Sequence, residues 1–463
     1  MLRSLVGSEM CIRDSMVADA QCPATIPEEL HMTTTALSSD TPAAAGYAPR
    51  AAIADRAWGD APSARYSAIA ERFRPVFAAI RAGAPEREQT HRLPQAELHR
   101  LRDLGLTRLR LPRELGGEDL TLPELFSLLI ELSEGDPNVT NALRSHFGLT
   151  EELLEQPAGE WRDGWLARIA AGALTGSGFS EVGDNTLGQH STTVVRQGDH
   201  YVVNGTKFYT TGSLLSEWIH ISASTEQGEP IGALVPFPSE GLEIVDDWDG
   251  FGQQLSASGT ARFDNVVLQA DHVKPYVGRF GYSVGFYQLV HLAELSGIGR
   301  AASRELAERV AARKRVYGGR SNARSSEDPQ VLEVVGRVRA AAHAAGVITL
   351  DAARALERAH HAKHLPPEQR QAVYDEAEIE VSQAVTTVTD LILDATARLF
   401  DALGASSAQR SQALDRHWRN ARTISSHNPR IYHTRIVGDF AVNGTPPPVR
   451  AGVGLPPGPA AAA

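Results

Sequence analysis

Few segments of this sequence carry residue types that perform catalysis. His427 stands in Thr-Ile-Ser-Ser-His-Asn-Pro, just after a basic stretch that ends at Arg422. An imidazole can exchange a proton near neutral pH. The stretch from Thr175 to Glu181 offers a serine hydroxyl beside a phenylalanine ring. A Walker loop, His-Glu-x-x-His, Cys-x-x-Cys and Gly-x-Ser-x-Gly are all missing, so no metal site is predicted.

Short β-branched runs alternate with turn signals between about residues 173 and 272. The clearest run is Tyr201 to Phe208, in which Asn204 and Gly205 are predicted to form the type I′ turn of a hairpin. Glycines between 172 and 178 are not followed by a helical pattern, which disfavours a dinucleotide site. The block therefore predicts a β-barrel or sandwich.

Helical patterns flank this block on both sides. Leu98, Leu101 and Leu104 share one helix face, with Pro94 in the first turn and Gly105 after the end. Further helices are predicted near 122–134, 139–155 and 158–171, and long helical patterns return from about 285 to 442. The expected fold is α+β, with an N-terminal helical domain, a middle β-barrel domain and a C-terminal four-helix bundle, at 56–172, 173–272 and 273–445.

Both ends of the chain are predicted to be flexible. Residues 1–55 are rich in Thr, Ser, Ala and Pro, and residues 1–15 resemble a translated sequencing artefact, with Met16 or Met32 as alternative starts. Residues 446–463 are rich in Pro, Gly and Ala. Neither end is expected to belong to the folded part.

Composition excludes several classes of protein. The 463 residues include 45 basic and 56 acidic ones, for a formal net charge of −11, so no nucleic-acid partner is expected. Apolar runs fall short of the ~18 residues needed to span a membrane, and no membrane association is expected. Cys11 and Cys22 are the only cysteines, which favours a reducing, cytoplasmic location.

Two stretches resemble the β-domain signatures of the acyl-CoA dehydrogenase superfamily. They are Thr175–Glu181, similar to a Leu-Thr-Glu-type loop, and Asn204–Gly212, similar to an Asn-Gly-x-Lys-x-aromatic-x-Thr hairpin. Segments 111–117, 250–260 and 315–318 resemble further motifs of that superfamily. In the family, the loop places a hydroxyl and backbone amides against the flavin ring, and the hairpin aromatic packs on it. The resemblance implies that the flavin is bound by Phe179, Ser180, Tyr209 and Thr211. The alternative is that these stretches are an ordinary loop and hairpin without a role in binding.

The residue at the position of the dehydrogenase's catalytic base indicates whether the chain can catalyse a dehydrogenase reaction. In many members of the superfamily a glutamate follows a helix that resembles Asp415–Arg422, and it removes the α-proton of a thioester. Here His427 takes the place of that glutamate. Proton abstraction by a carboxylate from this position is therefore lost.

The segment from Arg416 to Pro429 resembles instead the flavin-dependent monooxygenase branch of the superfamily, which includes the dibenzothiophene monooxygenases. Such enzymes take reduced FMN from a separate reductase, react it with O₂ and hold a C4a-hydroperoxide. The resemblance implies that His427 is the catalytic group that donates to the peroxide, with Ser180 near N5 and C4a as the second catalytic residue. The alternative for His427 is a structural helix-cap histidine.

Further cofactor contacts are implied by the same resemblance. Asn141 and His146 are expected to line the flavin, although five residues along a helix separate them widely in angle. Arg315 is expected to meet the FMN phosphate, with Ala405 and Ser406 adding donors, in one reading across a subunit interface. A homodimer or homotetramer is expected.

The favoured prediction is a two-component FMNH₂-dependent monooxygenase acting on a small organosulfur or similar apolar substrate. The runner-up is an acyl-CoA dehydrogenase or oxidase with FAD, which would need another base, either Glu181 or a glutamate between 376 and 381. A third reading is a flavoprotein relic that serves as an assembly subunit. Asn428 and Ile424 depart from the pattern of sulfone and thiophene enzymes, so the sequence leaves the substrate open.

Overall fold

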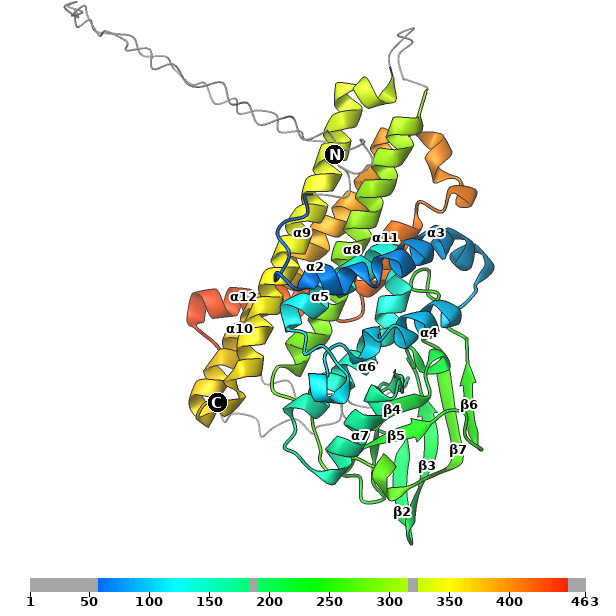
Figure 1. Cartoon of the computed structure of the whole chain (residues 1–463), viewed down its shortest axis with the longest axis vertical. Helices are drawn as coiled ribbons and strands as arrows, with labels where there is room; N and C mark the ends of the chain where they lie inside the picture. Colours follow the sequence, from blue (N-terminus) through cyan, green and yellow to red (C-terminus); the bar gives the residue numbers. More distant parts are fainter. Residues whose placement is uncertain (1–56, 183–189, 315–323, 449–463) are drawn as a thin grey trace, which may run out of the picture. The chain divides into compact units, whose positions relative to one another are not determined.

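The computed structural model describes residues 57–182, 190–314 and 324–448 (Figure 1). The predicted N-terminal tail lies outside these ranges, as do Arg315 and the predicted C-terminal tail beyond residue 448.

The N-terminal part is helical, as predicted. Thr121 and Glu124 form a capping box at the start of one helix, and Asp136 caps the next by accepting from the Asn138 backbone N–H at 3.0 Å. Pro94 and Gly105 flank a predicted helix as expected. The α-helices are α2 (Tyr66–Glu71), α3 (Arg74–Thr90), α4 (Gln95–Asp103), α5 (Leu122–Gly135), α6 (Pro137–Glu155) and α7 (Glu160–Ala170).

A single sheet follows, with strand order β1-β4-β2-β3-β7-β6 and with β5 paired to β4. Its apolar side chains form their own buried cluster. In the described residues β1 and β6 do not pair with each other, so the predicted barrel is a curled sheet instead. The strands are β1 (Thr175–Gly178), β2 (Thr193–Gln197), β3 (His200–Lys207), β4 (Trp218–Ser224), β5 (Pro230–Pro236), β6 (Leu242–Val245) and β7 (Thr260–Leu268).

The predicted turn at Asn204 and Gly205 is wrong. Both residues lie inside β3, where the pairing with β7 shifts register between Val203 and Gly205. Gly205 has φ +139°, and a Cβ there would lie 2.6 Å from the Thr192 Cα. The glycine therefore serves a β-bulge, and the hairpin turns instead at Gly198 and Asp199, between β2 and β3.

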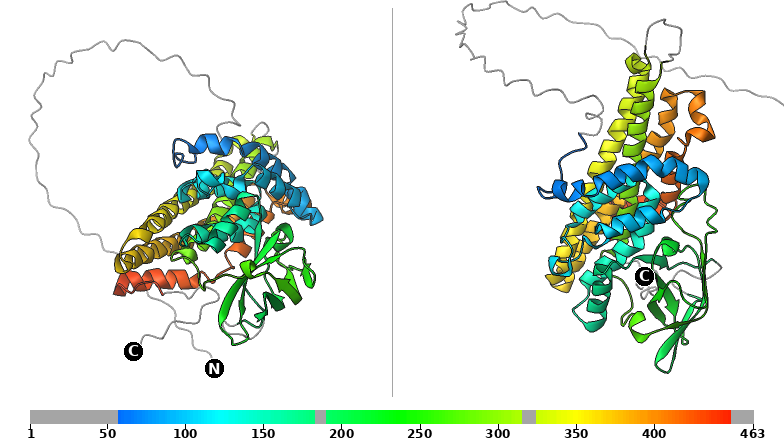
Figure 2. Two further views of the ribbon diagram at one scale, coloured as in Figure 1. Left: turned by 60° about the horizontal axis from the view of Figure 1, so that its bottom comes forward. Right: turned by 45° about the vertical axis from the view of Figure 1, so that its right-hand side comes forward.

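Three long helices and two short ones form the C-terminal part, where the sequence predicted a four-helix bundle. The long helices α8, α9 and α10 pack on one another, α5 and α6 pack on α8, and α12 packs on α10 (Figures 1 and 2). In the described residues, no helix is long and apolar enough to cross a membrane. The helices are α8 (Ser283–Ala312), α9 (Pro329–His361), α10 (Pro367–Arg398), α11 (Arg416–Ile424) and α12 (Ile431–Asn443).

Candidate functional site

The end of β1 and the loop after β3 lie side by side. The Phe208 N–H donates to the Ser180 carbonyl at 3.0 Å, and the Ser177 N–H donates to the Thr211 carbonyl at the same distance. The Thr211 hydroxyl lies 2.7 Å from the Ser258 hydroxyl. The structure therefore brings together the segments that hold four of the predicted flavin contacts.

These segments present a partly open aromatic and hydroxyl surface. Tyr209 is 48% exposed and its ring packs edge-on against Trp248, with centroids 5.5 Å apart. Phe179 is half-buried, whereas Ser180 is exposed and its hydroxyl has no hydrogen-bond partner among the described residues. A flat ring beside an unused donor is the chemistry that an isoalloxazine ring requires, so these residues fit a flavin.

A chain of ring contacts leads from this surface into the helices. The Arg279 guanidinium lies 4.3 Å from the Phe179 ring centroid and 4.7 Å from that of Tyr287. The Arg144 guanidinium lies 4.8 Å from the Tyr287 centroid, and its Nε donates to the Tyr287 carbonyl at 3.2 Å. Tyr287 can lie this close to α6 because Gly148 has no side chain, since a Cβ there would meet the Tyr287 Oη at 2.2 Å.

His427 follows α11 and lies next to His291 of α8, with ring centroids 4.5 Å apart. Its side chain is exposed on one side, while protein surrounds it on the others. The low-dielectric surroundings and the charge of Arg144 lower the pKa of His427 to about 3. At neutral pH this imidazole is therefore neutral and can still donate one hydrogen bond.

A buried carboxyl accompanies these imidazoles. Glu294 of α8 is fully buried, and its Oε2 lies 3.2 Å from the His291 Nδ1. Burial raises the pKa of Glu294 well above its usual value and lowers the pKa of His291 well below its own. Burial therefore favours the neutral form of both groups, in which the Glu294 carboxyl can donate to the His291 Nδ1.

Asn141 and His146 lie in α6 but have different surroundings. The Asn141 amide donates to the Gln253 side-chain oxygen at 3.0 Å, and the Gln253 N–H donates to the Asn420 Oδ1 at 2.6 Å, which connects α6 to α11. His146 is fully buried, and its Nε2 lies 2.8 Å from the Thr107 carbonyl oxygen. Its contacts are those of a core residue.

The expected phosphate contacts lie elsewhere in the chain. Arg315 is outside the described residues. Ala405 and Ser406 form part of a short 3₁₀ helix between α10 and α11 and are exposed. Neither makes a hydrogen bond to another predicted site residue in the described part of the chain.

Of the carboxylates that a dehydrogenase reaction would need, Glu181 is engaged. It accepts from Lys207 Nζ at 2.5 Å and from the Ser191 hydroxyl at 2.7 Å. Although burial opposes this, the hydrogen bonds from Lys207 and Ser191 lower the pKa of Glu181 far below its usual value, which makes it a weak base.

The three glutamates between residues 376 and 381 differ in their surroundings. Glu376 is exposed, and Glu380 forms an ion pair with Arg358. Glu378 is half-buried and lines a pocket of about 380 Å³ together with Arg279.

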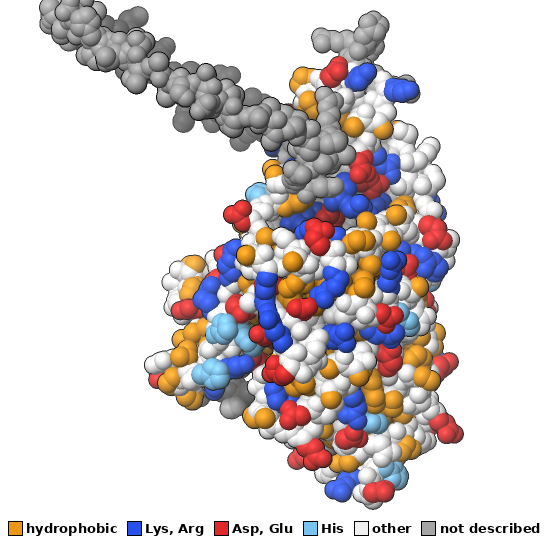
Figure 3. Space-filling model, viewed as in Figure 1, with side chains coloured by type: hydrophobic (Ala, Val, Ile, Leu, Met, Phe, Trp, Pro, Cys, Tyr) orange, Lys and Arg blue, Asp and Glu red, His pale blue; other side chains and the backbone are white. Residues whose placement is uncertain are grey.

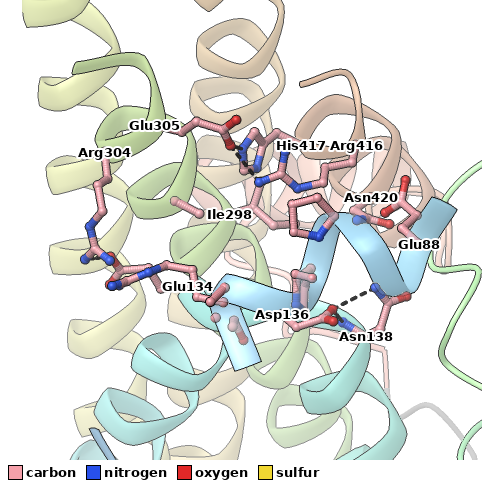
Figure 4. Close-up of a pocket in the computed structure, with 18 of the residues that line it drawn as sticks. Glu88, Glu134, Asp136, Asn138, Ile298, Arg304, Glu305, Arg416, His417 and Asn420 are labelled. Carbon is pink, nitrogen blue, oxygen red and sulfur yellow. Dashed lines mark hydrogen bonds and ion pairs between the residues drawn. The ribbon is translucent and has the colours of Figure 1, made fainter. Parts of the chain in front are cut away.

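A charged pocket of about 400 Å³ lies between α3, α8, α11 and the junction of α5 with α6 (Figure 4). Glu305 accepts from Arg416 at 2.6 Å and lies 2.9 Å from the His417 Nε2. Asn420 belongs to the lining of this pocket and joins it to the hydrogen-bond chain of Asn141. Most of its charged groups pair within the lining, where Glu305 also pairs with Arg309, and Glu134 pairs with Arg304.

Glu151, Glu155 and His360 come close enough together to hold a cation. Arg110 donates to Glu151 at 2.9 Å and Lys363 contacts Glu155 at 3.5 Å, so the carboxylates are already neutralised. Burial lowers the pKa of His360, but hydrogen bonds to both glutamates prevail and raise it to about 9. A protonated imidazole is a donor and not a ligand, so this cluster is an ion-pair network.

Sequence reasoning missed the residues that connect the Phe179 surface with His427 and its neighbour His291. His291 contacts His427, the charge of Arg144 acts on it, Glu294 lies against His291, and Arg144 and Arg279 share the Tyr287 ring. One signal was available: Gln288, His291 and Glu294 recur every three residues in an otherwise apolar run, and all three are buried in α8. Polar residues at helical spacing inside a core helix indicate a shared polar site.

Family models match two segments that together cover more than half of the chain. The model of the acyl-CoA dehydrogenase N-terminal domain matches residues 65–173, and that of the C-terminal domain matches residues 289–429.

Curated relatives match most of the chain at low identity. A dibenzothiophene monooxygenase from Mycolicibacterium goodii is 26% identical over 374 residues, which are 77% of this chain and 89% of the relative. A probable FMNH₂-dependent monooxygenase from Pseudomonas putida is 28% identical over 371 residues, 78% of this chain and 91% of the relative.

Solved structures agree with this fold. The FMN-bound dibenzothiophene monooxygenase from Paenibacillus sp. A11-2 superposes with a TM-score of 0.75 at 25% identity, covering 82% of this chain and 98% of its own. The methanesulfinate monooxygenase from Pseudomonas fluorescens gives a TM-score of 0.73 at 26% identity, with coverage of 82% and 97%.

Proposed function

Since the chain belongs to the acyl-CoA dehydrogenase superfamily, we propose that it is a flavin-dependent monooxygenase of the two-component type, which oxygenates a small organosulfur compound. It uses reduced FMN that a separate reductase supplies. The relatives named as FMNH₂-dependent and dibenzothiophene monooxygenases support this proposal.

The observation that carries the proposal is the position of His427. Its neutral imidazole lies beside His291, and both imidazoles feel the charge of Arg144, which shares the Tyr287 ring with Arg279 next to Phe179. A neutral imidazole can donate one hydrogen bond to an oxygen and return a proton to it. We assign the main catalytic role to His427. Ser180 is assigned as the second catalytic residue, whose hydroxyl would lie near N5 and C4a of the flavin.

The residues of the β1 end and the 208–211 loop fit a flavin. Phe179 and Tyr209 would pack on the ring, Ser180 and Thr211 would donate to its polar edge, and Asn141 would support the adjacent loop. Reduced FMN supplies the electrons and the C4a carbon at which dioxygen is activated. Arg315, Ala405 and Ser406 remain proposed contacts of the FMN phosphate. The proposed flavin contact of His146 is disfavoured, because its side chain is fully buried against the Thr107 carbonyl.

A second function is favoured by one observation, the buried carboxyl of Glu294. A dehydrogenase or oxidase with FAD needs a base, and Glu294 is a glutamate inside the polar group. Its raised pKa favours the protonated form, which can donate to His291 but cannot remove a proton.

We further propose that the enzyme is a homodimer or homotetramer in the cytoplasm. Exposed apolar residues on α12 support self-association. The restriction of cysteine to the first 22 residues supports a reducing compartment.

The test is rapid mixing. Protein loaded anaerobically with FMNH₂ and then mixed with O₂ should show a transient C4a-adduct absorbance. His427→Ala should shorten its lifetime by about 100-fold or more, within the ~10²–10⁴-fold range of a lost proton-transfer group. His361→Ala is the matched control, because His361 is exposed on α9 and forms an ion pair with Glu357.

The opposite outcome is equally clear. Tight binding of FAD, with bleaching of the flavin by an acyl-CoA in the absence of oxygen, would contradict the monooxygenase proposal and indicate a dehydrogenase. Loss of that bleaching in Glu294→Gln would then identify the base.

A further inference from the structure

A buried carboxyl and two imidazoles form a row that ends at the proposed catalytic histidine. The Glu294 Oε2 lies 3.2 Å from the His291 Nδ1. The His291 ring lies against that of His427, with centroids 4.5 Å apart and planes tilted by 48°. Glu294 and His291 are buried, whereas His427 is exposed. The row therefore leads from the interior of α8 to the surface.

Two polar atoms of this row have no use in the fold. The Glu294 Oε1 and the His291 Nε2 are buried, and neither makes a hydrogen bond to any part of the chain that the structure describes. A buried polar atom without a partner costs free energy and calls for an explanation. When Glu294 donates to the His291 Nδ1, the proton of that neutral ring resides on Nε2. His291 then has a donor without an acceptor, in a ring that lies against His427.

The environment of Glu294 differs from that of a surface carboxyl. On the face of the molecule shown in Figure 3, acidic side chains lie among basic ones at the surface, where water keeps carboxylates ionised. Burial raises the pKa of Glu294 well above its usual value, and the charge of Arg144 opposes this only in part. A carboxyl that keeps its proton at neutral pH can serve as an acid.

The helices around α8 contribute few charges near this row. The groups that face α8 include Arg144 of α6, Glu134 of α5, Thr349 of α9, Glu378 of α10, Arg416 and His417 of α11, and His427. Glu134 and the two α11 groups contact α8 about three turns after Glu294, and Glu378 faces it about two and a half turns before. Within the described ranges, Arg144 is the group whose charge acts on Glu294.

The role proposed for His427 requires a source of protons. Its imidazole is neutral at neutral pH, because its pKa is lowered to about 3 by burial and by the charge of Arg144. A neutral imidazole that loses its N–H proton becomes an imidazolate, which is far too basic to form under these conditions. His427 can give up a proton only if another reaches its second ring nitrogen at the same time.

We propose that Glu294 and His291 form a proton relay that supplies His427, with Glu294 as the buried acid. The inference rests on the proposed function and adds two positioning residues that act through His427. The Glu294 Oε2–H bond breaks as a bond forms from this proton to the His291 Nδ1. The Nε2 proton of His291 passes to the nearer ring nitrogen of His427, which gives its own proton to the oxygen that leaves as water. No electrons pass through the relay.

The geometry allows each transfer and its reversal. Because χ2 of histidine is a soft torsion, a rotation of either ring brings a nitrogen of His291 within hydrogen-bonding distance of His427. The charge of Arg144 stabilises the carboxylate that remains at Glu294. Since His427 is exposed, protons from solvent return along the same three side chains and restore the acid.

Infrared spectroscopy of the full-length protein tests the acid without flavin or oxygen. At neutral pH we expect a C=O stretching band of a protonated carboxyl, which shifts in D₂O and is lost in Glu294→Gln. Glu333→Gln is the matched control and should keep the band, because Glu333 is an exposed α9 residue paired with Arg337. An ionised Glu294 at neutral pH would overturn the inference.

The mixing experiment with FMNH₂ and O₂ tests the transfer. In Glu294→Gln the amide still donates to the His291 Nδ1 but has no proton to transfer. The lifetime of the transient absorbance should therefore fall by about 100-fold, at the lower end of the ~10²–10⁴-fold range of a lost proton-transfer group. His291→Phe keeps a ring beside His427 and should have the same effect. In both variants the lifetime should shorten further as the pH rises, because only solvent then supplies protons, whereas the wild-type lifetime should not depend on pH in the neutral range.

A double variant distinguishes a relay from a structural pair. Because Glu294 acts through His427, Glu294→Gln should add no effect in the His427→Ala background. Additive effects, or a wild-type lifetime and pH profile in Glu294→Gln shown to be folded by circular dichroism, would overturn the inference. Absence of the transient in the wild-type protein would instead contradict the proposed function, and the infrared band would still report on the state of Glu294.

Discussion

At the scale of single residues, the surroundings of His427 determine its chemistry. A solvent-exposed histidine is half protonated near pH 6.5. Here protein on most sides and the Arg144 charge disfavour the imidazolium form, so the neutral form persists to about pH 3. A neutral imidazole suits a role in which a proton is donated and then recovered.

This lowered pKa has a measurable consequence. Imidazole NMR of labelled protein, with His427→Asn for assignment, should show no titration of His427 between pH 5 and 8. Because its folded pKa lies below the unfolded one, the unfolded chain takes up this proton first as the pH falls through about 6.5. The stability of the folded state therefore declines from there towards pH 3, and His427→Asn should reduce that decline. A midpoint near 6.5 in the folded protein would contradict the burial argument.

At the scale of elements, a glycine allows the loop after β3 to lie close to α6. Gly212 has φ +80°, and a Cβ there would lie 2.2 Å from the Ala142 carbonyl oxygen of α6. The same loop holds Tyr209 and Thr211. The distance between the aromatic surface and α6 is therefore set by one residue without a side chain.

Gly212→Ala should consequently displace this loop. We expect a loss of about 1–3 kcal/mol in the free energy of unfolding, from the strained backbone and the clash, and weaker FMN binding. Chemical denaturation and flavin fluorescence measure the two effects. Gly198→Ala is the matched control: its φ is +65°, but nothing lies within 4 Å of the added Cβ, so FMN binding should be unchanged. Equal flavin affinity in both variants would show that the loop position does not matter.

At the scale of the whole molecule, α12 leaves apolar surface uncovered. Ile431 is 69% exposed and Val442 is 81% exposed. They stand eleven residues apart, about three helical turns, so they share one side of the helix. Tyr432 and Phe440 are also exposed, at 51% and 42%. Such a surface is typical of an interface.

The double variant Ile431→Glu, Val442→Glu should therefore lower the mass found by light scattering, from that of a dimer or tetramer towards that of a monomer. Arg354→Glu, an exposed substitution on α9, should leave the mass unchanged. A monomeric wild-type protein, or an unaltered assembly in the double variant, would show that α12 is not the interface.

Local patterns predicted much of the architecture. Leucine spacing and caps located the helix Gln95–Asp103, and a capping box marks the start of Leu122–Gly135. The predicted turn at Asn204 and Gly205 was wrong because the pairing of β3 with β7 places these residues in a bulge. A dipeptide contains no information about which strand will pair with it.

The sequence by itself determined the order of helical and β segments, the His427 position and the segments of Phe179 and Tyr209, since these depend on local spacing and on matching motifs. Only the tertiary structure decided that His291 of α8 lies against that imidazole and that the charge of Arg144 from α6 acts on it. The physical reason is that charge, burial and pKa depend on neighbours that are distant along the chain. Residues from α6 and from the segment after α11 become neighbours only when both pack on α8.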